Sequence, residues 1–282
     1  MMKPIKVIKN IWRFSRANII APLDFYFKKN RVLATQKLLD EHKKIPGNIS
    51  TRIHPNDQMY VSFLGDHYLE VGFSAVQCIL DVLCVSKTPP IKIKRILDFA
   101  CGHGRVLRIL KAVFPDAHIS GAEVDSTALT FCKNLFDIKP ILSSADFEDL
   151  AAEEKFNMIW CGSLITHLPE EKTIDLLRYF YESLEPGGLC IFSTHGELVA
   201  QMIQTKSSNS RLPHNLSLKL CQDYRTSGYG FESYGKDPNY GTSLVNPERM
   251  RLIAAATGNW SEIFCKPEAW ANHHDVYAYR KN

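Results

Sequence analysis

Three features that would classify the chain quickly are absent from it. No Cys-x-x-Cys pair occurs, because the eight cysteines are scattered singly and several lie in apolar stretches. Such cysteines act as small hydrophobic residues, so we expect reduced thiols without a zinc site. No run of about 18 uncharged apolar residues suggests a membrane-spanning helix. The basic amino-terminal stretch also lacks the apolar core and cleavage site of a secretory signal, so we expect a cytoplasmic protein.

Little net charge remains outside the first residues of the chain. The 282 residues carry +4 overall, but residues 1–37 contain nine Lys or Arg and one acid, which leaves the rest net acidic. A body of that charge argues against a nucleic-acid partner. Ile5, Ile8, Trp12 and Ile19 recur at roughly helical spacing among the basic residues. We interpret this segment as a helix that packs on the main domain or on a partner; the alternative is peripheral contact with an anionic membrane.

The pattern of apolar residues changes at about residue 90. Before this point, the apolar positions between Tyr68 and Leu83 follow helical periodicity. After it, strand-like and helical segments alternate, which predicts a parallel sheet with helices on both faces. We therefore divide the chain into an amino-terminal helical extension over residues 1–90 and a main domain over residues 91–282.

The main domain contains seven segments of strand character and four of helical character. The expected strands are Ile93–Phe99, His118–Ala122, Ile141–Ser143, Phe156–Cys161, Leu189–Thr194, Trp260–Pro267 and Asp275–Arg280. The expected helices are Arg105–Phe114, Ser126–Leu135, Thr173–Leu184 and Pro247–Ala256. Residues 196–246 interrupt this alternation of strands and helices. They are rich in Ser, Asn, Gly and Tyr, which predicts an inserted lid near a site.

The most informative motif follows the first strand. The strand reaches Asp98, and a turn with Gly102 and Gly104 then opens a helix. Glycine lets the backbone approach a ligand closely and adopt positive φ. The free amides at the beginning of the helix favour an anionic ligand group. A dinucleotide fingerprint would need a third glycine where Leu107 stands, so a nicotinamide-dependent oxidoreductase is the weaker alternative.

This loop resembles the Asp-x-x-x-Gly-x-Gly loop of the class I S-adenosylmethionine-dependent methyltransferases. The resemblance covers about residues 91–195 and, more weakly, the final hairpin; it includes the turn Pro186-Gly187-Gly188 before a strand. It implies a Rossmann-like sheet of seven strands, mostly parallel with the seventh strand antiparallel. It also implies S-adenosylmethionine as the cofactor.

Further residues lie where this family binds its cofactor. Glu123 matches the acid that receives the ribose hydroxyls, although Asp is commoner there, and the offset of Asp125 suggests that it caps the next helix. Asp146 matches the acid that meets the adenine amino group, with Phe147 as its apolar neighbour. Each match alone also fits a structural role, as a turn cap or a solvated strand end. The implied cofactor site consists of Asp98, Ala100, Cys101, Gly102, Gly104, Glu123, Val124, Asp146, Phe147, Cys161 and Ser163.

Four histidines are candidates for the catalytic base. Ligands of an open parallel sheet bind at the carboxyl ends of its strands, and histidine suits proton transfer near neutral pH. His167 follows the fourth strand and His195 ends the fifth. His273 and His274 precede the last strand, which begins at the same edge if it is antiparallel as in the family. We predict His195 as the base and His167 as the second choice; without an accompanying acidic cluster, we predict no metal site.

The sequence therefore predicts methyl transfer to a small-molecule or carbohydrate-like acceptor, at oxygen, with nitrogen acceptors left open. The main alternative is a non-catalytic module that keeps the fold and binds the cofactor or, through residues 1–37, a membrane surface.

Overall fold

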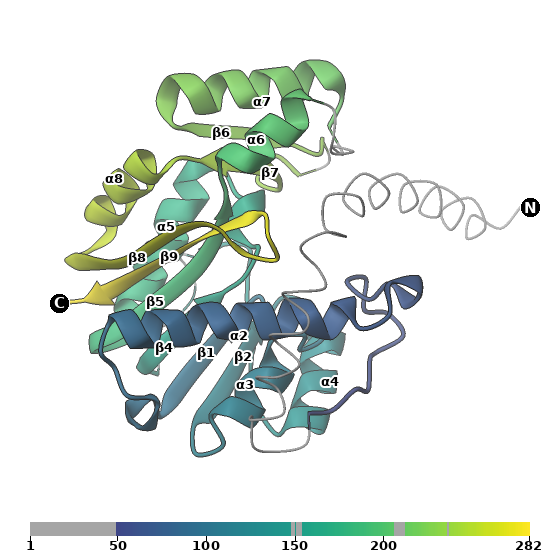
Figure 1. The fold of residues 1–282 in the computed structure, drawn as a ribbon, viewed down its shortest axis with the longest axis vertical. Helices are drawn as coiled ribbons and strands as arrows, with labels where there is room; N and C mark the ends of the chain where they lie inside the picture. The colour runs from purple at the N-terminus through teal and green to yellow at the C-terminus, as the bar shows by residue number, and fades with distance from the viewer. Residues whose placement is uncertain (1–48, 148–149, 151–153, 206–211, 236) are drawn as a thin grey trace, which may run out of the picture.

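The computed structural model of the chain describes residues 49–147, 150, 154–205, 212–235 and 237–282 (Figure 1). The amphipathic segment predicted at the amino terminus, with its membrane contact, lies outside these residues.

A seven-stranded sheet forms the centre of the described part of the chain. Its strands are β1 (Arg95–Phe99), β2 (His118–Glu123), β3 (Lys139–Leu142), β4 (Phe156–Cys161), β5 (Leu184–His195), β8 (Trp260–Trp270) and β9 (His274–Lys281). The strand order is β3-β2-β1-β4-β5-β9-β8. Neighbouring strands are parallel except that β9 runs antiparallel to both β5 and β8. The predicted Rossmann-like sheet with one antiparallel strand is confirmed.

Helices cover both faces of the sheet. One core contains residues of α2 (His67–Val85), α3 (Leu107–Val113) and α4 (Ser126–Phe136), and the other contains residues of α5 (Glu170–Ser183) and α8 (Pro247–Thr257). Single-turn 3₁₀ helices lie at η1 (Ser62–Leu64), η2 (Pro90–Lys92) and η4 (Ile165–His167). Because side chains alternate along a strand, Ile96 of β1 joins the first core and Leu97 the second. Strands buried on both faces are expected to be almost continuously apolar, as β1 and β4 are.

Helix α2 shares its core with the sheet. By length and composition alone it could cross a membrane, but more than half of its apolar window is buried inside the fold. The Trp270 indole donates a hydrogen bond to the Val71 carbonyl (2.9 Å), which joins α2 to the end of β8. Figure 1 shows α2 lying across the sheet. These contacts are those of a core helix; the division of the chain at residue 90 stays a prediction.

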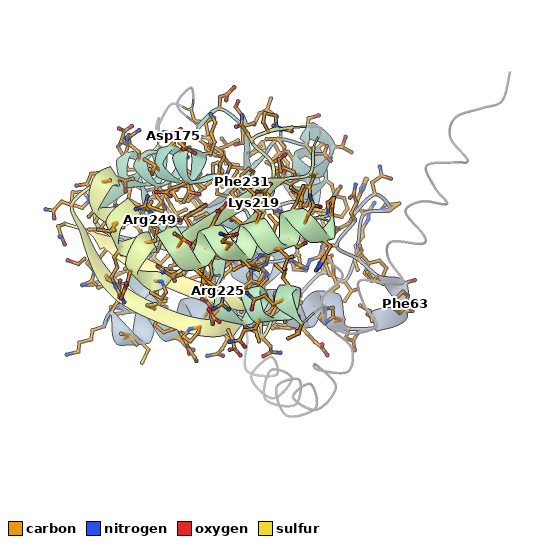
Figure 2. All side chains as sticks on the ribbon, turned by 90° about the horizontal axis from the view of Figure 1, so that it is seen from above. Phe63, Asp175, Lys219, Arg225, Phe231 and Arg249 are labelled. Carbon is orange, nitrogen blue, oxygen red and sulfur yellow. The ribbon has the colours of Figure 1, made fainter. Side chains whose placement is uncertain are left out.

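The segment between β5 and α8 has secondary structure of its own. It contains α6 (Glu197–Gln204), α7 (His214–Ser227) and a hairpin of β6 (Tyr229–Ser233) with β7 (Gly241–Val245). The Tyr229 hydroxyl donates to the Leu168 carbonyl (2.9 Å) and lies 2.8 Å from the Thr173 hydroxyl, so the hairpin is anchored beside η4. Figure 2 looks down on this insertion, with α7 and its Lys219 and Arg225 above the rest of the molecule. Its role as a lid stays a prediction.

Candidate active site

The loop after β1 takes left-handed backbone conformations at three positions. Ala100, Gly102 and Gly104 have φ of 59°, 52° and 81°. A Cβ added to Gly102 would meet no atom within 4 Å, whereas one added to Gly104 would overlap the ring of Phe136 on α4. The two glycines therefore differ in what they do. Gly104 permits the loop to pack against α4, and Gly102 leaves open space on the outer side of the loop.

Glu123 at the end of β2 holds this loop from the side. Its half-buried carboxylate accepts hydrogen bonds from the backbone amides of Gly102 (2.9 Å) and Val124 (2.8 Å). The Val124 side chain is 59% exposed next to it, an apolar surface open to a ligand. Asp125 caps α4 by accepting from the amides at the beginning of that helix, which confirms the role predicted for it.

Asp98 is the buried acid of the site. Its carboxyl is 2% exposed, and its Oδ2 atom has no hydrogen-bond partner among the described residues. Burial, with repulsion from Glu123 added, raises the pKa of Asp98 to about 8, although Arg105 partly opposes the shift. The carboxyl is therefore largely protonated at neutral pH and would regain its charge next to a cation.

The two residues predicted near the adenine have different surroundings. Asp146 is exposed and forms an ion pair with Lys172 (3.0 Å). Phe147 is 4% exposed, and its ring meets that of Phe99 edge-on in the core below the sheet edge. The ring of Phe147 thus fills the core and offers a ligand little surface. Contact between these residues and the adenine stays a prediction.

The cysteines of the predicted site point into the protein. A hydrogen bond with Cys132 and burial raise the pKa of Cys101, and burial raises that of Cys161. All eight cysteines are free; six are buried in the core, whereas Cys84 is exposed and Cys265 is half-buried. Ser163 has a φ of 61°, and its amide donates to the Ser193 hydroxyl (2.8 Å), which fixes the backbone after β4.

Three of the four predicted histidines come together. The pairing of β5 with β9 sets His195 opposite His274, so β9 does begin at the carboxyl edge of β5. The ring centroids of His195 and His274 are 4.9 Å apart, and those of His273 and His274 are 4.1 Å apart. One ring nitrogen from each of the three lies within 4.8 Å of the others. We call these three residues the histidine cluster.

The histidine cluster is uncharged at neutral pH. Burial lowers the pKa of His195, and His273 and His167 lower it further; burial and the other two imidazoles of the cluster likewise lower the pKa of His274. The Nδ1 atoms of His195 and His274 are buried without a hydrogen-bond partner among the described residues. An unpaired buried polar atom costs roughly 1–3 kcal/mol, so these atoms are suited to a ligand.

His167 lies apart from the cluster, under the insertion. Its Nδ1 atom is 2.7 Å from the Gly241 carbonyl, and its ring stacks on Tyr240 with centroids 4.9 Å apart. Tyr234 approaches the same nitrogen with its hydroxyl (3.3 Å). The tyrosine-rich insertion therefore meets the sheet edge at this histidine.

Sequence reasoning missed Arg105 and Trp270. The Arg105 guanidinium lies over the rings of Tyr68 (6.0 Å) and Trp270 (5.8 Å), and Trp270 in turn contacts the ring of His274 (4.7 Å). The Tyr68 hydroxyl donates to Asp57 (2.5 Å), so the segment before α2 also reaches this region. The position of Arg105 directly after the glycine loop was the one available signal for it. Nothing local in the sequence signals Trp270.

Comparison with known proteins identifies the central region. Residues 96–188 match the family of methyltransferase domains. A malonyl-[acyl-carrier protein] O-methyltransferase of Bacillus anthracis is 27% identical over 123 residues, which are 43% of this chain and 45% of the relative. A second such enzyme, from Bacillus cereus, is 24% identical over 152 residues, 54% of this chain and 55% of its own length. The chain thus spans about half the length of the curated relatives it matches.

Solved structures share the fold at low identity. An S-adenosylmethionine-dependent methyltransferase from Clostridium acetobutylicum has a TM-score of 0.51 and 13% identity, over 78% of this chain and 97% of its own. The S-adenosylmethionine-bound amino pentose methyltransferase CalS10 from Micromonospora echinaspora has a TM-score of 0.52 and 12% identity, over 81% and 100%.

The geometry of the loop fits the cofactor of that family. Asp98 offers a buried carboxyl for a cationic group, Gly102 leaves room for a ligand to approach the backbone, and Glu123 provides carboxylate oxygens beside it. Residues 96–188 match the family of methyltransferase domains, and the described part of the chain shares its fold with solved S-adenosylmethionine-dependent methyltransferases.

Proposed function

We propose that the protein transfers a methyl group from S-adenosylmethionine to an oxygen atom of a small-molecule or carbohydrate-like acceptor. The cofactor supplies an electrophilic methyl group on a sulfonium. The protein must hold the acceptor oxygen in line with that methyl group, exclude water and accept a proton from the oxygen. Orientation of this kind lowers a barrier by several kcal/mol, up to roughly 7–11 kcal/mol.

The observation that carries the proposal is the cradle between β1 and β2. Among the described residues, Gly102 has a left-handed backbone with open space where a side chain would be, Glu123 accepts from its amide, and the buried Oδ2 atom of Asp98 has no partner. In a protein without a ligand there, that buried oxygen costs stability. A cationic cofactor with hydroxyl groups satisfies both acids.

Oxygen as the acceptor atom is supported by the uncharged imidazoles at the same edge. His195 is the first choice for the base and His167 the second, because His195 ends β5 at the carboxyl edge and its Nδ1 atom has no hydrogen-bond partner among the described residues. The curated relatives are O-methyltransferases by name. Tyr234 and Tyr240 stand beside His167 and offer an aromatic surface on which a sugar or a ring could lie.

The first test is calorimetric titration of the full chain with S-adenosylmethionine and with its demethylated product. We expect micromolar binding that Asp98→Ala and Glu123→Gln each weaken about tenfold or more. Glu262→Gln is a matched control, because Glu262 lies on the edge strand β8, away from the loop, where it forms an ion pair with Arg251. An affinity for S-adenosylmethionine that none of the three substitutions changes would refute the proposed cofactor site.

The acceptor is then sought with radiolabelled methyl groups on sugars, phenols and carboxylic acids. Label transferred at oxygen, and reduced by His195→Ala or His167→Ala, supports the proposal. Binding without transfer to any acceptor favours the non-catalytic alternative. A rise in melting temperature with a nicotinamide dinucleotide and none with S-adenosylmethionine would favour the oxidoreductase.

A further inference from the structure

We infer that the histidine cluster, His195, His273 and His274, is a binding site for a divalent transition metal such as Zn²⁺. The inference concerns the acceptor side of the proposed active site and in that respect rests on the proposed function. It departs from the sequence, in which the absence of an acidic cluster predicted no metal.

The first observation is the convergence of nitrogen atoms from two strands. One ring nitrogen from each histidine lies within 4.8 Å of the other two. Around a tetrahedral zinc ion with Zn–N distances of about 2.0–2.1 Å, nitrogen ligands are about 3.4 Å apart. Bringing the three ring nitrogens from 4.8 Å to this separation therefore takes movements of roughly an ångström, which small side-chain rotations provide. Three imidazoles with one further open position is the ligand set of a catalytic zinc site.

The second observation is the pair of buried nitrogens that lack a partner. The Nδ1 atoms of His195 and His274 belong to different strands, and neither has a hydrogen-bond partner among the described residues. Buried polar atoms are normally satisfied, so two such atoms on neighbouring rings of one cluster call for a ligand. A metal ion bound by both nitrogens would satisfy them together.

The third observation is how the outer nitrogens are held. A histidine that binds a metal usually donates its other ring N–H to a carbonyl or carboxylate, which fixes the tautomer and the ring. His273 Nδ1 lies 2.8 Å from the Ala271 carbonyl. His195 hydrogen-bonds the Ser243 backbone, and because its Nδ1 has no partner in the described part of the chain, that bond uses Nε2. Two of the three rings are thus oriented as metal ligands are.

The charged residues near the histidine cluster determine which ligand would occupy the open position of the metal. Arg105 lies near His273 and His274 and repels a cation. A metal ion beside a guanidinium is most stable with an anionic group in its open position. An acceptor oxygen that binds as alkoxide or carboxylate provides that charge. With the metal on His195, the base would be His167, which is not in the cluster.

The test uses the full chain after removal of metal with a chelator. Titration with Zn²⁺ should show one equivalent bound with submicromolar Kd, weakened at least about tenfold in His195→Ala and in His274→Ala. His118→Ala is the control, because His118 is exposed at the beginning of β2, at the opposite edge of the sheet. Circular dichroism checks that each variant is folded.

A second variant keeps the test decisive if the alanine variants unfold. Co²⁺ should give the visible absorption of a tetrahedral site, and His195→Cys should add a thiolate-to-cobalt charge-transfer band, because cysteine is a good ligand for such metals. No stoichiometric binding, or equal binding by the cluster variants and His118→Ala, would overturn the inference.

Failure of this inference differs from failure of the proposed function. S-adenosylmethionine that binds the metal-free protein through Asp98 and Glu123, without any Zn²⁺ site, leaves the methyltransferase standing. If the histidine cluster binds Zn²⁺ but the chain does not bind S-adenosylmethionine, the metal site is supported and the proposed methyltransferase function is refuted.

Discussion

Replacing Asp98 with asparagine should change how stability depends on pH. The folded-state pKa of Asp98 is about 8, compared with 3.8 for an ordinary aspartate. Between these values the folded protein holds a proton that the unfolded chain has released. Stability is therefore highest below the unfolded pKa and declines as pH rises, until the folded carboxyl also ionises near pH 8. Asparagine has nearly the same shape and no such proton.

The size of the effect follows from the linkage relation. One pKa unit corresponds to about 1.36 kcal/mol, so from about pH 5 to about pH 7 the wild type should lose about 2.7 kcal/mol relative to Asp98→Asn. The total stability of a domain is roughly 5–15 kcal/mol, so the loss is measurable. The assay is urea unfolding of the cofactor-free protein at several pH values, followed by tryptophan fluorescence. Asp116→Asn, in an exposed loop, is the control. A free-energy difference between wild type and Asp98→Asn that stays constant from pH 5 to pH 7 would refute the reasoning.

Four further predictions concern the loop and the insertion. Ala100→Gly should raise the free energy of unfolding by about 1 kcal/mol, because Ala100 has a φ of 59°, and a shifted urea midpoint would show it. Gly104→Ala should lower it by roughly 1–3 kcal/mol, because the new Cβ overlaps Phe136. Gly102→Ala should cost less stability but abolish calorimetric binding of S-adenosylmethionine, because its Cβ enters open space; equal effects of the two alanines would contradict this distinction. Tyr229→Phe should cost about 1–2 kcal/mol in urea unfolding through two buried hydrogen bonds, and an unchanged midpoint would show that they do not anchor the insertion.

The sequence by itself determined approximately where the seven strands of the main sheet and four of its helices lie and which loop follows the first strand, but it did not predict the two helices and the hairpin of the insertion. These features are local. Apolar runs bounded by turns predicted β4 at Phe156–Cys161 with the same bounds that the structure has. The pattern of Asp98, Gly102 and Gly104 predicted a turn with positive φ, since only glycine adopts it without strain. Asp125 as a helix cap was likewise readable from its place before the helix.

The tertiary structure alone decided what these residues meet. Phe147 lies at the position predicted for a ligand contact, yet its ring is in the core against Phe99, because burial depends on the helices that cover that face. The pKa of Asp98 depends on its complete burial, which only the packed fold provides. The resemblance placed His195 and His274 at one sheet edge, but only the antiparallel register of β5 with β9 sets them directly opposite each other. Such juxtapositions depend on strand pairing at long range, which the local periodicity of a sequence does not encode.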